Sequence, residues 1–165
     1  ISIYESLCEM GSPFGIRDFG GQAFNSMRLE KMYRAYGAEF TEEISALEAG
    51  MDRFLDLSRN FIGSDNIKER QSKGVETQLA YLIFDDEIPA ECFGNEAVFD
   101  GDELSGIITS GAYGYRVGHS IAFAYLNPSH CSEGKALRVE TSLGSRQCHV
   151  SMNAAYDNNN EKLRS

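Results

Sequence analysis

Residues 104–126 have the sequence LSGIITSGAYGYRVGHSIAFAYL, in which β-branched and aromatic side chains are frequent on both sides of Gly114. This composition, interrupted by glycine turn signals, predicts two strands at 104–113 and 118–126. Only a few residues separate the two runs, whereas a parallel crossover needs a dozen residues or more. The two strands are therefore predicted to be antiparallel neighbours.

The same kind of pattern continues on both sides of this pair. Short apolar runs between clusters of Asp, Gly, Asn and Ser predict four further strands, at 75–84, 96–99, 136–143 and 146–152. No helix-length pattern intervenes, so we expect antiparallel neighbours throughout, with Leu79, Tyr81 and Ile83 facing one side. A small closed barrel or a sandwich accommodates these strands.

Before Gly74, apolar residues recur at helical spacing instead. Helices ended by glycine are predicted over 2–10, 22–36 and 65–73, with stops at Gly11, Gly37 and Gly74. Ser64 is a suitable N-cap for the third helix. Residues 53–57 fit a short strand.

The predicted fold class is therefore α+β, with a helical and mixed N-terminal layer followed by a small antiparallel β-barrel. The change in pattern near Gly74 predicts two domains, 1–73 and 74–165. A chain of 165 residues with 42% hydrophobic content is large enough to bury a core.

Charge and hydropathy exclude two classes of partner. Twenty-five Asp and Glu against fifteen Lys and Arg give a formal charge of −10, the wrong sign for a protein that binds phosphate backbones. No apolar run approaches the roughly 20 residues that span a bilayer, and the longest candidates, such as 79–84, have the length of a strand. We expect neither nucleic acid nor membrane as a partner.

Four cysteines are widely spaced in a chain too long to need disulfides, so reduced thiols and a cytoplasmic location are predicted. The chain opens with Ile1 instead of Met, and its first residues already fit a helix in progress. This beginning is typical of a fragment of a longer polypeptide.

Several motifs suggest chemistry that their context does not support. His130-Cys131 and Cys148-His149 lack the ligand spacing of structural zinc, and adjacent strand residues point to opposite faces. Asp100–Glu103 lacks the calcium-binding loop, and the glycines of 111–118 lie between two strands instead of before a helix. No nucleophile carries a local signature such as G-x-S-x-G.

Arg28 is the more informative residue. It lies in the mixed segment 25–31, Asn-Ser-Met-Arg-Leu-Glu-Lys, where its guanidinium could form a bidentate bond with a ligand carboxylate or with an internal Glu. The pattern alone favours the internal ion pair, because charged faces of helices are usually structural.

A series of segments, in order, resembles the glycine-cleavage T-protein (aminomethyltransferase) superfamily. Those similar to the second half of its folate-binding domain are 25–31, 48–54 and 61–63. Those similar to its C-terminal barrel are 107–115, 117–122 and 124–125. Lys31, the Tyr-Gly-Tyr of 113–115 and the ending 155–165 look most like dimethylglycine and sarcosine dehydrogenases.

The resemblance implies a tetrahydrofolate site in which folate accepts a one-carbon unit from an aminomethyl or N-methyl donor. Arg28 matches the folate-site arginine of the family, and Tyr156 aligns with a substrate-contacting tyrosine. In the dehydrogenase branch this region follows an FAD-binding oxidase part. No FAD fingerprint occurs here, so FAD is expected only in an upstream domain.

Two departures from the family pattern limit the expected activity. The catalytic aspartate and the pterin-binding glutamate of the family lie upstream of the matched region, and Ala112 replaces a usual glycine. We expect no catalytic residue in this chain, no activity of the chain alone, and either upstream domains or self-association as its protein partners. The alternatives are a folate-binding regulatory protein, whose Lys-Gly-Cys-Tyr-x-Gly-Gln signature is absent, and a non-catalytic barrel for protein contacts.

Overall fold

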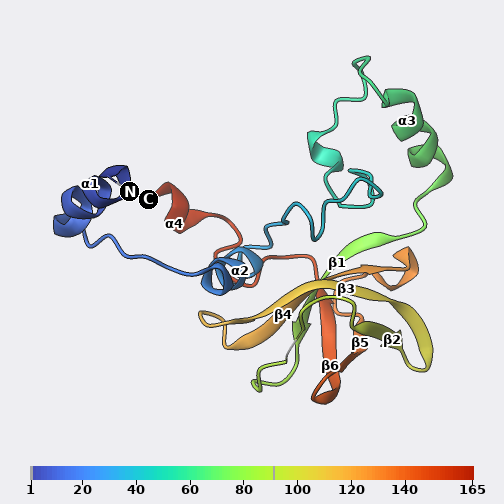
Figure 1. The fold of residues 1–165 in the computed structure, drawn as a ribbon. Coiled ribbons are helices and arrows are strands. Elements are labelled where there is room, and N and C mark those ends of the chain that lie inside the picture. Colours follow the sequence, from blue (N-terminus) through green and yellow to red (C-terminus); the bar gives the residue numbers. More distant parts are fainter. Residues whose placement is uncertain (1, 91) are drawn as a thin grey trace.

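Six strands close into an antiparallel barrel in the order β1-β4-β3-β2-β5-β6 (Figure 1). The computed structural model describes residues 2–90 and 92–165, so the interpretation of Ile1 lies outside the described residues. The strands are β1 Gln78–Phe84, β2 Ala97–Asp100, β3 Glu103–Gly114, β4 His119–Leu126, β5 Ala136–Thr141 and β6 Gly144–Ser151. The α+β class and the antiparallel barrel are confirmed.

The β3–β4 pair that the sequence singled out is the longest ladder of the barrel. It runs from Gly114 opposite His119 to Gly106 opposite Leu126. The register shifts between Ile108 and Ser110, where one extra residue of β3 bulges out of the pairing. This irregularity bears directly on the functional site.

Strand β1 is buried on both faces. Its side chains Ala80, Leu82 and Phe84 belong to the core inside the barrel. Leu79 and Tyr81 point the other way, into a second apolar cluster with Leu29, and Ile83 packs against that cluster. The predicted common face of Leu79, Tyr81 and Ile83 is confirmed.

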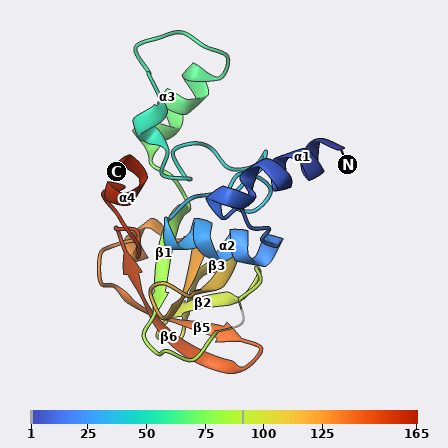
Figure 2. The ribbon, with the colours of Figure 1, turned by 90° about the vertical axis from the view of Figure 1, so that its left-hand side faces the viewer.

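Helix α2, Gly21–Glu30, lies across the outside of the barrel over β3 and β4 (Figure 2). Its Leu29 is completely buried in the second cluster, and the hydroxyl of Tyr81 donates to the carbonyl oxygen of Leu29 at 2.8 Å. The helix therefore packs against β1 as well as against the central pair. The outer face of the barrel therefore fixes the position of α2.

The predicted extent of this helix, 22–36, is wrong at its C-terminal end. Met32 has a φ of 57°, in the left-handed region, and its amide donates to Leu29 O while the amide of Tyr33 donates to Arg28 O, both at 2.8 Å. These two bonds form the Schellman closure of a helix. Glycine is usual at the left-handed position, and the Met at that position concealed the stop.

The remaining helices are α1 Ser2–Gly11, α3 Ser64–Lys73 and α4 Glu161–Arg164, with short 3₁₀ turns at Ser12–Phe14, Asp52–Phe54 and Pro128–His130. Helix α1 has no buried residue, and both α1 and α3 stand away from the barrel (Figure 1). The stop at Gly74 is confirmed, with φ 86°, but the residue before α3 is Gly63, so Ser64 is not its cap.

The predicted strand at 53–57 is also wrong. Amide bonds from Phe54 to Met51 O and from Leu55 to Asp52 O close a 3₁₀ turn there instead. The four cysteines are free thiols, and no described helix is long and apolar enough to cross a bilayer.

We expect the close approach of β3 and β4 at Gly106 to tolerate no side chain. A Cβ at this position would overlap the carbonyl oxygen of Tyr125 and lie 2.9 Å from Cα of Leu126, so Gly106→Ala should lower the free energy of unfolding by about 3 kcal/mol. Gly21→Ala is the matched control, because nothing lies within 4 Å of a Cβ there. It should leave stability unchanged or raise it by up to ~1 kcal/mol. Equal denaturation midpoints for the two variants would contradict the packing described.

Candidate functional site

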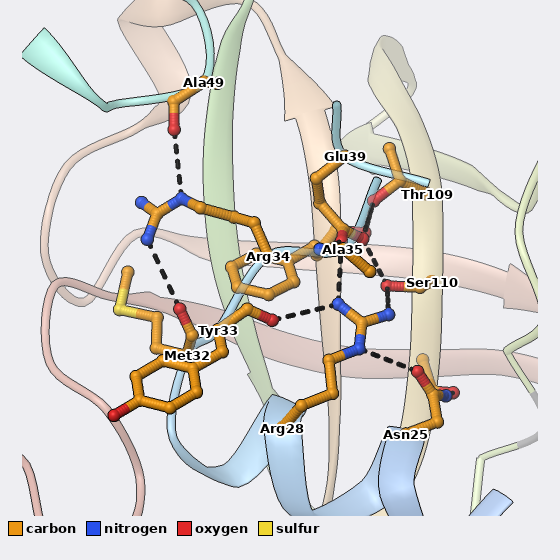
Figure 3. Close-up of polar contacts among 12 residues, drawn as sticks. Asn25, Arg28, Met32, Tyr33, Arg34, Ala35, Glu39, Ala49, Thr109 and Ser110 are labelled. Atoms are coloured by element: carbon orange, nitrogen blue, oxygen red, sulfur yellow. Dashed lines mark hydrogen bonds and ion pairs between the residues drawn. The ribbon is translucent and has the colours of Figure 1, made fainter. Parts of the chain in front are cut away.

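Arg28 belongs to α2, and only 7% of its surface is exposed. Its guanidinium faces β3 (Figure 3). Nε donates to Asn25 Oδ1 at 2.9 Å, and Nη2 donates to Ser110 Oγ at 2.9 Å. Nη1 donates both to Tyr33 O at 3.1 Å and to Glu39 Oε2 at 2.7 Å. Of the five N–H groups of an arginine, four therefore have partners, and one on Nη2 has none within residues 2–90 and 92–165.

Glu39, the counterion of Arg28, is completely buried. Its Oε2 accepts from Arg28 and from the amide of Ala35 at 2.8 Å. Its Oε1 accepts from the hydroxyl of Thr109 at 2.8 Å and from that of Ser110. Buried charges are tolerated when they are paired and hydrogen-bonded, and this carboxylate meets both conditions.

The bulge in β3 explains how two consecutive hydroxyls reach one carboxylate oxygen. On a regular strand the side chains of residues 109 and 110 would point to opposite faces. The register shift between Ile108 and Ser110 breaks that alternation, so Thr109 and Ser110 both contact Glu39. The bulge therefore builds the part of the site that belongs to the barrel.

The internal ion pair that the sequence pattern favoured for Arg28 is thus present. It joins α2, the segment after it and β3 through one buried network. The predicted contact between Arg28 and folate stays a prediction.

Tyr156, the second predicted site residue, is held at the end of the helix that carries Arg28. Its amide donates to Glu30 O at 3.0 Å, and the neighbouring Asp157 pairs with Lys31 at 3.1 Å. Lys162 lies 5.1 Å from the centre of the Tyr156 ring and donates to its hydroxyl at 3.0 Å. The C-terminal segment therefore docks on the end of α2, although it is remote in sequence.

Arg34 is a second, half-buried arginine of the same region. Its Nε donates to Ala49 O at 3.0 Å and its Nη1 to Met32 O at 3.3 Å (Figure 3). Its guanidinium lies 5.8 Å from the ring centre of Phe123, and that of Arg28 lies 6.0 Å from the same ring. Burial lowers the pKa of Arg34 and the charge of Arg53 lowers it further, whereas the negative charge of Glu39 acts on it in the opposite direction.

A serine, a histidine and an aspartate also meet at one end of the barrel. Nδ1 of His130 lies 2.7 Å from Ser105 Oγ, and its Nε2 lies 3.4 Å from Asp100 Oδ2. Ser105 is buried, and Lys135 occupies the same aspartate at 2.6 Å. The aspartate that would orient the histidine is already paired with Lys135, so we interpret this cluster as a structural tie between β2, β3 and the turn at 128–130.

The sequence reasoning missed Glu39, Thr109, Ser110 and Arg34. Glu39 lies in an irregular segment where no periodicity marks a buried position, and the two hydroxyls depend on a bulge. The sequence pattern favoured an internal acidic partner for Arg28, but several carboxylates follow it in the chain. Only the fold selects Glu39 among them.

Two family models match this chain. "GCVT N-terminal domain" matches residues 1–59, and "Glycine cleavage T-protein C-terminal barrel domain" matches residues 78–157. Together the two ranges cover most of the sequence. The chain belongs to the glycine cleavage T-protein family. The predicted domain boundary at 73 and 74 lies between the two ranges and stays a prediction.

Relatives of known name are much longer than this chain. It is 34% identical over 143 residues to human mitochondrial dimethylglycine dehydrogenase, covering 85% of this chain and 16% of that protein. It is 31% identical over 140 residues to the aminomethyltransferase of Corynebacterium aurimucosum, covering 84% and 37%. The crystal structure of aminomethyltransferase T of Bartonella henselae has the same fold, with a TM-score of 0.75, 20% identity, and coverage of 82% and 38%.

We expect Glu39→Gln to lower the free energy of unfolding by about 3 to 5 kcal/mol, because it leaves the Arg28 charge buried without its counterion. The control is Asp56→Asn, which breaks an ion pair with Arg59 whose side chains are 59% and 81% exposed. That change should alter stability by no more than ~0.5 kcal/mol. Denaturant titration measures both, and a Glu39→Gln midpoint as high as that of the control would exclude a stabilising role for the buried pair.

Proposed function

We propose that this chain is the tetrahydrofolate-side portion of a one-carbon transfer enzyme. The parent reaction would move an aminomethyl, methylene or N-methyl carbon onto folate. Membership of the glycine cleavage T-protein family supports this proposal, as do relatives named aminomethyltransferase and dimethylglycine dehydrogenase. The observation that carries it is the buried Arg28 network, which fixes α2 on β3 beside the docked Tyr156.

The residues of the chain suit a folate ligand in charge and shape. Arg28 retains one Nη2 hydrogen that has no partner among the described residues, and its frame of Glu39 and Ser110 fixes the direction of that hydrogen. The Tyr156 ring is a flat surface for the aromatic part of folate, and its hydroxyl needs only to exchange Lys162 for the ligand. When bound, tetrahydrofolate supplies the nitrogen atoms that accept the carbon unit.

The chemical step is assigned to residues outside this chain. The aspartate and glutamate of the family pattern fall upstream of the matched region, as does any FAD domain. The chain spans 16% of the dehydrogenase and 37% of the aminomethyltransferase to which it was compared. The role of this chain would be to orient folate, and its partners would be upstream domains. The cytoplasmic location of the protein stays a prediction.

A non-catalytic module is the second candidate function. The chain is 26% identical over 146 residues to the mouse mitochondrial pyruvate dehydrogenase phosphatase regulatory subunit, whose name describes a regulator. A barrel of this family could therefore serve folate sensing or protein contacts. A folate titration discriminates one of these alternatives, because the absence of folate binding would favour a barrel for protein contacts.

We expect calorimetric titration with 5-formyltetrahydrofolate to show binding, and Tyr156→Phe to weaken it by about 0.5 to 1.5 kcal/mol through loss of the hydroxyl. Tyr115→Phe, at a residue 82% exposed, is the control and should leave affinity unchanged.

Arg28→Lys keeps the charge and loses the planar fork, so the folate affinity per folded molecule should fall by about 1 to 3 kcal/mol. A stability loss with unchanged affinity would leave Arg28 a purely structural role.

The chain alone should show no turnover. With dimethylglycine, sarcosine or an aminomethyl donor and tetrahydrofolate, product should not rise above the rate without protein, because the aspartate and glutamate of the family pattern lie upstream of the matched region. Mass spectrometry of the folate product measures this. Turnover above background would place catalytic groups within these 165 residues and overturn the assignment of the chemical step to upstream residues.

A further inference from the structure

Two arginines near α2 differ in how their charge is balanced. The charge of Arg28 is neutralised by Glu39 at 2.7 Å. Arg34 approaches the same buried ring of Phe123, yet within residues 2–90 and 92–165 no carboxylate lies at ion-pair distance from its guanidinium. A half-buried cation without a counterion is unfavourable in a protein. An anion at this position would remove that cost.

Some N–H groups of Arg34 have no partner among the described residues. Two of its five N–H groups donate to Ala49 O and Met32 O, which leaves three, two of them on Nη2. In Figure 3 the dashed lines from Arg34 end on the carbonyl oxygens of Ala49 and Met32. A Cβ on Gly50 would lie 3.3 Å from Nη2, so a side chain at this position would crowd the nitrogen.

A second unneutralised arginine strengthens the local field. Arg53 is exposed, its guanidinium lies 4.6 Å from the ring centre of Phe54, and it too has no carboxylate partner in the described part of the chain. Arg53 lies near enough to Arg34 for its charge to lower the pKa of Arg34, so both positive charges act at the same place. A planar guanidinium fork with free N–H groups is suited to a carboxylate.

We propose that Arg34, assisted by Arg53, binds the glutamate carboxylate of the folate ligand, an assignment that rests on the proposed function. Arg28, with four of its N–H groups occupied, has no second free N–H for a bidentate bond to a carboxylate. Arg34 has three. In this arrangement Arg28 holds α2 against β3, and Arg34 selects ligands that carry the glutamate.

The test compares 5-formyltetrahydrofolate with the primary amide of 5-formyltetrahydropteroate, which has neither the glutamate nor a carboxylate. The unmodified chain should bind the glutamate form about tenfold more tightly or better, the range for a hydrogen bond to a charged group. Arg34→Gln should abolish that preference while retaining binding of the amide, and Arg34→Lys should retain only part of the preference. Arg59→Gln makes the same change of charge at a residue 81% exposed and should retain the full preference.

The outcomes separate this inference from the proposed function. Equal affinity of the unmodified chain for both compounds, or a full preference in Arg34→Gln, overturns the role of Arg34 and leaves folate binding intact. Binding of neither compound overturns both. Circular dichroism checks that each variant is folded. Should Arg34→Gln not fold, the exposed Arg53→Gln decides: a preference reduced by about two- to fivefold supports the site, and an unchanged preference contradicts it.

Discussion

The buried ion pair between Arg28 and Glu39 is the interaction on which the arrangement of this protein depends. Removing two charges from water costs several kcal/mol per ion, and their attraction offsets that cost only when the remaining polar atoms are also satisfied. Glu39 is completely buried and accepts four hydrogen bonds. Helix α2, the segment after it and strand β3 must therefore keep their relative positions for the pair to exist.

This requirement connects features that otherwise look unrelated. The left-handed Met32 ends α2 early and directs Tyr33 O toward Arg28. The bulge in β3 turns the hydroxyls of Thr109 and Ser110 to the same side. Each is a local departure from regular structure, and each provides a partner for one of the two buried charges. Irregular backbone is thus used where the buried network needs a hydrogen-bond donor or acceptor.

The arginines divide two tasks between them. Four of the five N–H groups of Arg28 are bonded within the protein, which suits a residue that holds α2 against β3. Arg34 is anchored to two carbonyl groups but lacks a counterion in the described chain, which suits a residue whose anion comes from a ligand. The proposed folate site therefore combines an inner charge that is balanced during folding with an outer charge that is balanced on binding.

Alternation and turn residues in the sequence determined the antiparallel strands, because strand periodicity and short connections leave few other pairings. The motifs also indicated the family, and the roles of Arg28 and Tyr156 at a folate site stay predictions. The tertiary structure alone decided that Glu39 is the counterion of Arg28, that α2 stops at Glu30, and that Arg34 forms no ion pair with a carboxylate of residues 2–90 and 92–165. These depend on contacts between residues far apart in the chain, on a left-handed Met and on a bulge, none of which has a periodic signal in the sequence.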